Sequence, residues 1–276
     1  MDRRTFLAAG AAASLLQGAF KKPVGLELYS VRKEFVKDMA GTIKAVGKMG
    51  YEGVELFGSY ADWTPAQAKE AYTMIKDAGM KCWSAHTGAK YFTPEHLDRV
   101  IELNSIIESK YMIMSSAGKV DGIDGWKKVA VSLNTAAEKL KKVKKGTGFH
   151  NHASEFMPLN GQKPIEVLAK ETVKDVVLQL DVGTCIEAGT DPIAWIKANP
   201  GRIRSLHMKD WKRGLPNPHD GYKVLIGEGE TDWKAVVNES LKTGGAEHLL
   251  IEQEGSRFSE FETAQKCIEN FKKIMA

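Results

Sequence analysis

Short apolar runs rich in β-branched residues recur along the chain, and amphipathic stretches of helical period separate them. The apolar runs predict strands at 24–30, 53–57, 81–86, 111–115, 146–151, 176–181, 205–209 and 248–252. The stretches between them predict helices at 33–49, 65–78, 94–109, 125–142, 164–170, 191–197, 233–242 and 259–274. Local signals agree with this division, because Thr64-Pro65 and Thr93-Pro94 can begin helices, whereas Gly50, Gly79 and Gly244-Gly245 follow them.

Alternating strands and helices predict a parallel sheet with right-handed crossovers. Eight such units suit closure into a (β/α)8 TIM barrel, and a length of 276 residues fits that fold. The alternative is an open, doubly wound sheet, but no Gly-x-Gly-x-x-Gly turn follows the first predicted strand. No linker or change in composition divides the chain, so we expect a single α/β barrel domain at 23–276.

The first 22 residues differ from the rest and are typical of a signal segment. Arg3-Arg4 precede an apolar, Ala-rich run at 7–16, and Ala19 is a candidate last residue before cleavage. The paired arginines resemble a twin-arginine signal, which predicts a periplasmic or otherwise exported protein. The apolar run is too short to span a bilayer, so no stable membrane insertion is expected. The alternatives are a packed or dispensable N-terminal helix, and a cytoplasmic protein that does not use the signal.

Composition is that of an ordinary globular protein, with 43% hydrophobic and 27% charged residues. The formal net charge is +4, and the densest basic run, at 139–145, falls at the end of a predicted helix without interleaved aromatic residues. Such a run predicts a solvated helix end and argues against nucleic-acid binding. The three cysteines, Cys82, Cys185 and Cys267, are far apart and form no Cys-x-x-Cys pair, so buried single thiols are expected.

Ionisable residues gather at the carboxyl ends of the predicted strands, where a TIM barrel keeps its active site. Six of the eight strands carry them, at Glu55, His86, His150, His152, Glu155, Asp181, His207, Lys209, Asp210, Glu252 and Glu254. Because several buried carboxylates and imidazoles are costly to pack together without a counter-charge, the set predicts one divalent metal ion: Mn, Zn, Fe, Co or Mg. Each residue also has a structural alternative. Asp181 can cap the next turn, Asp210 and Glu254 can be solvated rim residues, and Glu55 and His86 can be bonded within the core.

Several motifs resemble the xylose-isomerase-like sugar phosphate isomerase/epimerase superfamily, which also has an AP-endonuclease branch. They are GLELYSVR at 25–32, GYEGVELFG at 50–58, FHNHASEF at 149–156, QLDVGT at 179–184, HMKDW at 207–211, GEGETDW at 227–233 and IEQE at 251–254. The resemblance implies one metal ion held by residues after strands five to eight, with Asp181, His207 and Glu252 as three of its ligands. Relatives have a Glu where this chain has His150, so the fourth ligand is either His150 or Glu155. We favour Glu155, because hard cations prefer oxygen.

The resemblance also implies a mechanism, in which a proton is removed beside a carbonyl and the metal stabilises the enediolate. We expect His152 or His150 as the base, Glu252 between metal and substrate, and Lys209 at the developing oxyanion. The remaining predicted substrate contacts are His86, Glu55 and Trp211.

The expected activity is that of a sugar isomerase/epimerase. Two alternatives stay open: a lyase or hydratase acting on a keto-glycoside or keto-sugar, and a non-catalytic carbohydrate-binding barrel. Thr184, Tyr222 and Val224 stand at or near the extra zinc-ligand positions of the endonuclease branch, which argues against DNA repair. Export argues for an unphosphorylated sugar or keto-sugar as the partner. Relatives often dimerise, so a homodimer is a further possibility.

Overall fold

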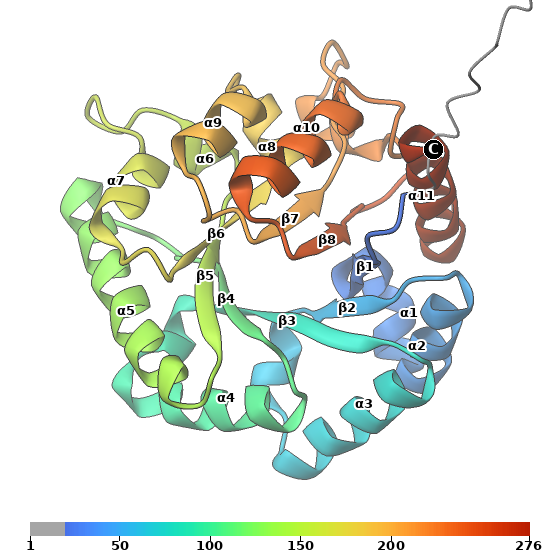
Figure 1. Cartoon of the computed structure of the whole chain (residues 1–276), viewed down its shortest axis with the longest axis horizontal. Helices are drawn as coiled ribbons and strands as arrows, with labels where there is room; N and C mark the ends of the chain where they lie inside the picture. Colours follow the sequence, from blue (N-terminus) through green and yellow to red (C-terminus); the bar gives the residue numbers. More distant parts are fainter. Residues whose placement is uncertain (1–19) are drawn as a thin grey trace, which may run out of the picture.

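A computed structural model describes residues 20–276 as one closed barrel of eight parallel strands, which confirms the predicted fold (Figure 1). Each strand pairs with its neighbours in chain order, and β1 pairs with β8 to close the barrel. The strands are β1 (Val24–Glu27), β2 (Gly53–Leu56), β3 (Lys81–Gly88), β4 (Tyr111–Ser116), β5 (Gly146–His150), β6 (Val177–Asp181), β7 (Ser205–Met208) and β8 (His248–Ile251). The predicted signal at 1–22 lies outside the described residues up to position 19.

Helices surround the barrel and connect successive strands (Figure 1). The α-helices are α1 (Arg32–Lys37), α2 (Met39–Lys48), α3 (Pro65–Asp77), α4 (Pro94–Ile106), α5 (Gly122–Lys142), α6 (Ala153–Phe156), α7 (Pro164–Glu171), α8 (Val182–Glu187), α9 (Pro192–Ala198), α10 (Trp233–Glu239) and α11 (Glu260–Met275). Short 3-10 helices are η1 (Leu28–Val31), η2 (Gly58–Asp62), η3 (Ala89–Phe92) and η4 (Pro218–Lys223), and η5 (Ser240–Gly244) is a π-helical turn. Gly50 and Gly79 have positive φ at helix ends, and Thr64 forms a capping box with Gln67, as the sequence predicts.

Most predicted elements differ from the observed ones by one to three residues at an end, and two differences have a clear local cause. The predicted strand 24–30 ends at Glu27, because the chain turns there into η1. The predicted helix 33–49 is interrupted at Asp38, whose backbone is extended (φ −153°, ψ 93°) and whose side chain caps α2 by accepting from Gly41 N at 2.9 Å. The first difference matters for the site, since it places Glu27 at the carboxyl end of β1.

The amino-terminal end of the barrel interior is filled by Trp83. Its indole lies against Gly25 and Gly53, where a Cβ would overlap the ring, and it stacks on the His248 imidazole with centroids 5.0 Å apart. Glycine at both positions therefore makes room for the indole. Because the interior is packed at this end, the polar site occupies the opposite end.

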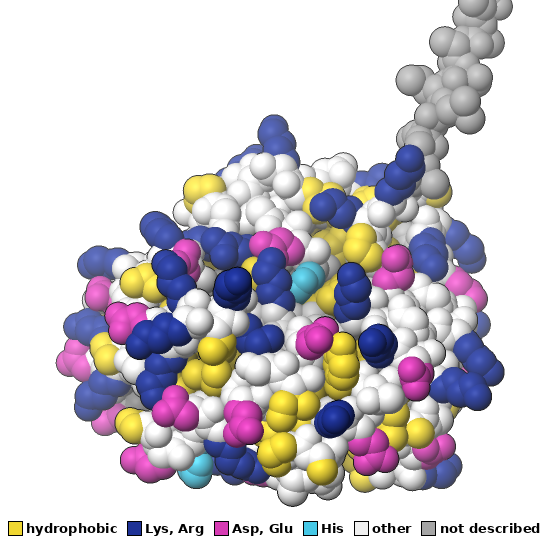
Figure 2. All heavy atoms as spheres, turned by 60° about the horizontal axis from the view of Figure 1, so that its bottom comes forward, with side chains coloured by type: hydrophobic (Ala, Val, Ile, Leu, Met, Phe, Trp, Pro, Cys, Tyr) yellow, Lys and Arg dark blue, Asp and Glu magenta, His cyan; other side chains and the backbone are white. Residues whose placement is uncertain are grey.

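The outer surface carries mixed charge. Figure 2 shows lysine and arginine side chains interspersed with carboxylates over the face it presents. Cys82, Cys185 and Cys267 are buried free thiols, as predicted. Within residues 20–276, no helix has the length and apolar character needed to cross a bilayer.

Candidate active site

Four buried side chains converge at the carboxyl ends of consecutive strands. His150 ends β5, Asp181 ends β6, His207 lies in β7, and Glu252 directly follows β8. One ligand atom from each lies within 4.8 Å of the others. Because neighbouring strands of a closed barrel end at the same rim, residues about 100 positions apart in the chain meet here. This group is called the four-residue cluster below.

Each imidazole of the cluster is held by a hydrogen bond on the side that faces away from the other cluster residues. His150 Nδ1 lies 3.1 Å from Gln179 Oε1, and His207 Nε2 lies 2.8 Å from Glu55 Oε1. These oxygens can only accept, so each ring donates through that nitrogen and turns its other nitrogen toward the cluster. His207 Nδ1 is accordingly 3.0 Å from Glu252 Oε2, and His150 Nε2 is 3.9 Å from Asp181 Oδ2.

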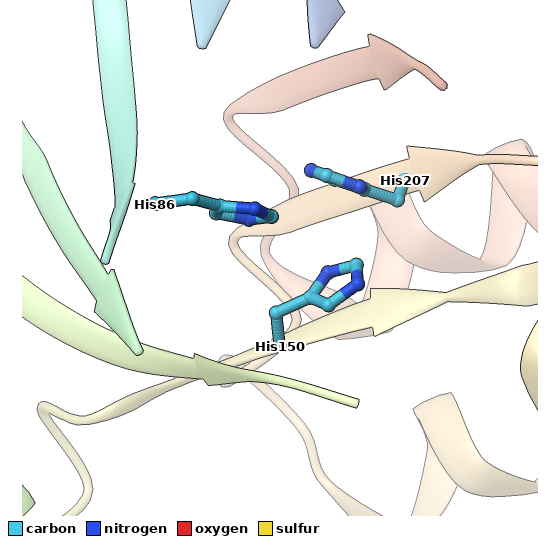
Figure 3. A group of neighbouring side chains, drawn as sticks. All are labelled: His86, His150 and His207. Carbon is cyan, nitrogen blue, oxygen red and sulfur yellow. The ribbon is translucent and has the colours of Figure 1, made fainter. Parts of the chain in front are cut away.

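A third imidazole, that of His86 on β3, completes the floor of the site (Figure 3). Its ring lies nearly parallel to that of His207, with centroids 5.1 Å apart, and 4.7 Å from that of His150. His86 Nε2 is 2.6 Å from both Glu55 Oε1 and Gln179 Oε1. His86 is thus bonded within the core while also lining the cavity described below.

Glu55 connects the imidazoles from below. Its Oε1 contacts His86 and His207, while its Oε2 accepts from Gln179 Nε2 at 2.8 Å and from the Ser84 hydroxyl. Burial alone would raise the pKa of Glu55, but the neighbouring His86 and His207 hold it well below the ordinary value. Glu55 is therefore an anionic anchor for the rings, and it lies outside the cavity wall, although the sequence predicts a substrate contact.

Glu155, the favoured fourth ligand, lies apart from the four-residue cluster. It is in the short helix α6, where its Oε2 accepts from His152 N at 2.7 Å in a capping box. His150 takes the strand-five place in the cluster instead. His152 itself is 48% exposed at its side chain and lines the cavity, with its ring 5.1 Å from that of His150.

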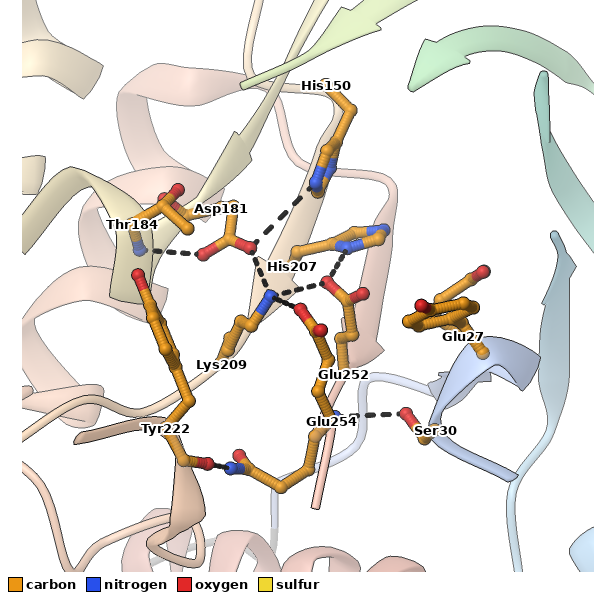
Figure 4. Close-up of polar contacts among 12 residues, drawn as sticks. Glu27, Ser30, His150, Asp181, Thr184, His207, Lys209, Tyr222, Glu252 and Glu254 are labelled. Atoms are coloured by element: carbon orange, nitrogen blue, oxygen red, sulfur yellow. Dashed lines mark hydrogen bonds and ion pairs between the residues drawn. The ribbon is translucent and has the colours of Figure 1, made fainter. Parts of the chain in front are cut away.

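Lys209 brings a positive charge into the site (Figure 4). Its Nζ lies 3.3 Å from Asp181 Oδ2 and 3.5 Å from Glu252 Oε2, and it also contacts Glu254 Oε1. Burial alone would lower the pKa of Lys209, but the carboxylates of Asp181 and Glu252 raise it well above the ordinary value. Lys209 is therefore a fixed ammonium group beside the two carboxylates.

The protonation of the four-residue cluster reflects burial and these charges. Burial, followed by the charges of neighbouring histidines, holds the pKa of His150 well below its ordinary value, so His150 is neutral. Burial alone would also lower the pKa of His207, but Glu55 and Glu252 raise it to about 9. Burial raises the pKa of Asp181, whose Oδ1 also caps α8 by accepting from Thr184 N at 2.9 Å. Asp181 thus caps the next helix and still directs its Oδ2 into the site.

A cavity of about 700 Å³ opens above the cluster, a size typical of small-molecule sites. Its wall includes His152, Lys209 and Glu252, and aromatic side chains at Tyr29, Phe57 and Tyr222. Trp211, a predicted substrate contact, lies outside this wall and is buried beside Gly221.

The structure also brings in residues that the sequence reasoning missed: Glu27, Gln179, Ser84 and Tyr222. The criterion that selected Glu55, a carboxylate within an otherwise apolar predicted strand, also applies to Glu27.

Asp210 is a structural residue in this region, and the alternative of a solvated rim residue is wrong for it. It is fully buried and accepts from Gly227 N (2.8 Å), Gly229 N (3.1 Å), Thr231 Oγ1 (2.9 Å) and Trp233 Nε1 (3.1 Å). These bonds tie the GEGETDW segment to the end of β7. Asp210 thereby fixes the loop that follows the metal-ligand candidate His207.

The four-residue cluster fits a divalent cation. Two imidazoles and two carboxylates are a donor set that suits Zn, Mn, Fe or Co, and the anchored outer nitrogens are what metal-binding histidines usually show. The Lys209 ammonium contacts the same two carboxylates, so it would share them with the cation. The identity of the metal does not follow from this donor set.

A closed eight-stranded barrel with such a cluster at its carboxyl rim defines a class of barrel enzymes rather than one activity. The sequence model of the xylose isomerase-like TIM barrel family matches residues 43–274, and the chain belongs to that family. The family contains isomerases, epimerases and dehydratases, so an enzymatic role and a small-molecule sugar substrate fit this chain.

Among curated proteins, an inosose dehydratase of Lacticaseibacillus casei is 24% identical over 160 residues, which is 52% of this chain and 53% of that protein. The chain thus spans about half the length of the curated relatives it matches.

Solved structures share the fold. A sugar phosphate isomerase/epimerase from Parabacteroides distasonis ATCC 8503 has a TM-score of 0.76 at 24% identity, covering 96% of this chain and 98% of that one. A probable 3-DHS dehydratase, AsbF, from Bacillus anthracis has a TM-score of 0.70 at 14% identity, covering 90% and 98%. At these identities the likeness concerns the fold alone.

Proposed function

We propose that this protein is a divalent-metal-dependent lyase or dehydratase that acts on a keto-sugar or keto-glycoside. The reaction removes a proton from the carbon beside the carbonyl and expels the oxygen substituent on the next carbon. The observation that carries the proposal is the buried four-residue cluster at the floor of a sugar-sized cavity. The curated relatives named dehydratases support elimination as the outcome.

Each residue of the site has a role in this proposal. A bound divalent cation supplies Lewis-acid polarisation of the carbonyl, and His150, Asp181, His207 and Glu252 would hold it. His152, half exposed in the cavity wall, takes the proton. The Lys209 ammonium neutralises negative charge that develops on the carbonyl oxygen.

A second candidate function is epimerisation, which begins with the same proton removal and returns the proton to the opposite face. His150 and Glu252 favour it, because they lie at the ends of β5 and β8 and would act as the pair of groups that removes and returns the proton. The two functions differ in their products, since epimerisation conserves the mass of the sugar whereas elimination divides or dehydrates it.

The experiment that tests the proposal follows hydrogen exchange and product mass together. Metal-loaded protein is incubated with keto-glycosides in D₂O, and mass spectrometry measures deuterium incorporation and any unsaturated product. Asp181→Asn should lose bound metal, exchange and product, whereas Asp121→Asn, an exposed residue whose side chain makes no capping bond, should keep all three. Absence of both metal binding and exchange in the wild type would leave a carbohydrate-binding barrel without catalysis.

We also propose that residues 1–22 direct export, on the strength of Arg3-Arg4 and the apolar run at 7–16. An exported enzyme would act on unphosphorylated sugars. Cell fractionation checks this, because replacing both arginines by lysine should retain the protein in the cytoplasm. An unchanged distribution would contradict the export proposal and leave sugar phosphates as candidate substrates.

A further inference from the structure

Glu27 is a buried carboxyl group that no side chain among residues 20–276 satisfies. It ends β1, is 0% exposed to bulk solvent, and lies in the floor of the cavity. Neither of its oxygens has a side-chain hydrogen-bond partner among residues 20–276. The backbone N–H of Tyr29 faces the carboxyl group and only weakly lowers its pKa. Figure 4 shows it beside the Glu252 and Lys209 network without joining it. Buried polar groups in folded proteins are nearly always paired, so this exception calls for a partner from the cavity.

The neighbour Glu55 has the opposite environment. The two carboxyl groups are paired in register on β1 and β2, and both point into the barrel. Glu55 accepts hydrogen bonds from four side chains, whereas Glu27 accepts none from a side chain within residues 20–276. Two adjacent carboxyl groups in such different surroundings are expected to differ in protonation, with the unbonded one neutral.

The groups that face Glu27 agree with a neutral carboxyl. His86 on β3 has its Nδ1 4.0 Å from Glu27 Oε1, which is beyond hydrogen-bond reach. Burial, followed by the negative charge of Glu55, raises the pKa of Glu27 well above its ordinary value, and the charge of His207 opposes this only in part. Glu27 therefore presents an O–H to the cavity.

We propose that Glu27 donates this proton to the departing oxygen of the substrate. The assignment deepens the proposed elimination and rests on it. His152 takes the proton from the carbon beside the ketone, and the C–H electron pair forms the enolate. As the ketone re-forms, the neighbouring C–O bond breaks, and its electron pair goes to the oxygen, which takes the Glu27 proton. The products are an unsaturated ketone and an alcohol, and solvent carries the His152 proton back to Glu27.

The test compares leaving groups that differ in their need for a proton. Methyl and 4-nitrophenyl 3-keto-glucosides are given to the wild type, to Glu27→Gln, and to Glu52→Gln, a control at an exposed position before β2. With the methyl glycoside, elimination by Glu27→Gln should fall about 10²- to 10⁴-fold, the usual contribution of general acid catalysis. With the 4-nitrophenyl glycoside, whose leaving group nitrophenolate is a stable anion, the rate of elimination should fall less than about tenfold. Glu52→Gln should match the wild type with both substrates.

Deuterium exchange beside the ketone separates this role from the proposed function. In Glu27→Gln the ratio of exchange to elimination should rise, because proton removal precedes loss of the alcohol. Equal losses with both glycosides, or loss of exchange in proportion, would overturn the proton-donor role and make Glu27 a binding or structural residue. A wild type that neither exchanges nor eliminates would instead overturn the proposed function, and the role of Glu27 with it.

Infrared spectroscopy tests the protonation of Glu27 in the wild-type protein itself, without an activity assay on a variant. A protonated carboxyl group has a C=O infrared band distinct from that of carboxylates. Wild type at neutral pH should show such a band, and the difference spectrum between wild type and Glu27→Gln should contain it, while the variant unfolds at a similar urea concentration. A wild type without a protonated carboxyl band would contradict the proposal.

Discussion

Replacing Glu55 by Gln should weaken metal binding without removing a metal ligand. Glu55 Oε1 accepts from His207 Nε2 at 2.8 Å, and its Oε2 accepts from Gln179 Nε2 at 2.8 Å. An amide has a single acceptor oxygen, so its NH₂ must face either the imidazoles or Gln179, and all of these are donors. The proton of His207 is then no longer held on Nε2, and Nδ1, the nitrogen that faces Glu252, competes for it.

The expected magnitude follows from the contacts. Losing the partner that orients a metal-binding histidine typically costs about 10- to 100-fold in affinity. That range corresponds to about 1.4 to 2.7 kcal/mol. It agrees with the cost of about 1 to 3 kcal/mol for a buried donor left unsatisfied, which is the state that the amide would impose. The loss of a negative charge near the cluster acts in the same direction.

The assay is calorimetric titration of chelator-treated protein with Zn²⁺, Mn²⁺ or Co²⁺. Ser84→Ala is the matched control, because it removes one donor to Glu55 and keeps the carboxylate, so its affinity should stay within about threefold of wild type. The reasoning fails if Glu55→Gln binds the cation as tightly as wild type, or if the two variants lose affinity equally.

Three further predictions concern stability, and urea unfolding checks each. Asp210→Ala should lower the free energy of unfolding by about 3 to 5 kcal/mol, because it leaves several buried donors without an acceptor. Asp121→Ala, at an exposed position, should leave the free energy of unfolding almost unchanged, and equal effects of the two substitutions would contradict the anchoring role of Asp210. Burial lowers the pKa of His248 to about 4 from its ordinary 6.5, so the folded state favours the neutral ring. The free energy of unfolding should therefore fall by about 3 kcal/mol on account of this residue as pH drops from 6.5 through 4, and His248→Phe should remove this contribution. Gly53→Ala should cost about 1 to 3 kcal/mol because its Cβ meets the buried indole, whereas Gly58→Ala, with open space around it, should be tolerated.

The barrel could be predicted from the sequence because its signals are repeated and local. Each apolar run is long enough to show its period, and helix signals such as Thr64-Pro65 fall between the runs. The placement of Asp181, His207 and Glu252 at one rim follows from the topology, since parallel strands end on the same side.

The rest of the site depends on contacts that a sequence pattern does not encode. The position of Glu155 is set by α6, a single turn of four residues and too short to show a helical period. Glu27 was passed over because the predicted strand runs to residue 30, which places Glu27 inside the strand, whereas the strand ends at Glu27 itself. Gln179 carries no charge, so a search for ionisable residues passes over it, yet it orients both His86 and His150.

The indole of Trp83 at the closed end of the barrel has a consequence for product release. Gly25 and Gly53 lie against the indole and His248 stacks on it, so the ring fills the barrel interior at that end. In the proposed elimination, both products must then leave through the mouth by which the substrate arrived. A product that stays in the cavity excludes the substrate, so inhibition by the unsaturated sugar should be competitive with the substrate.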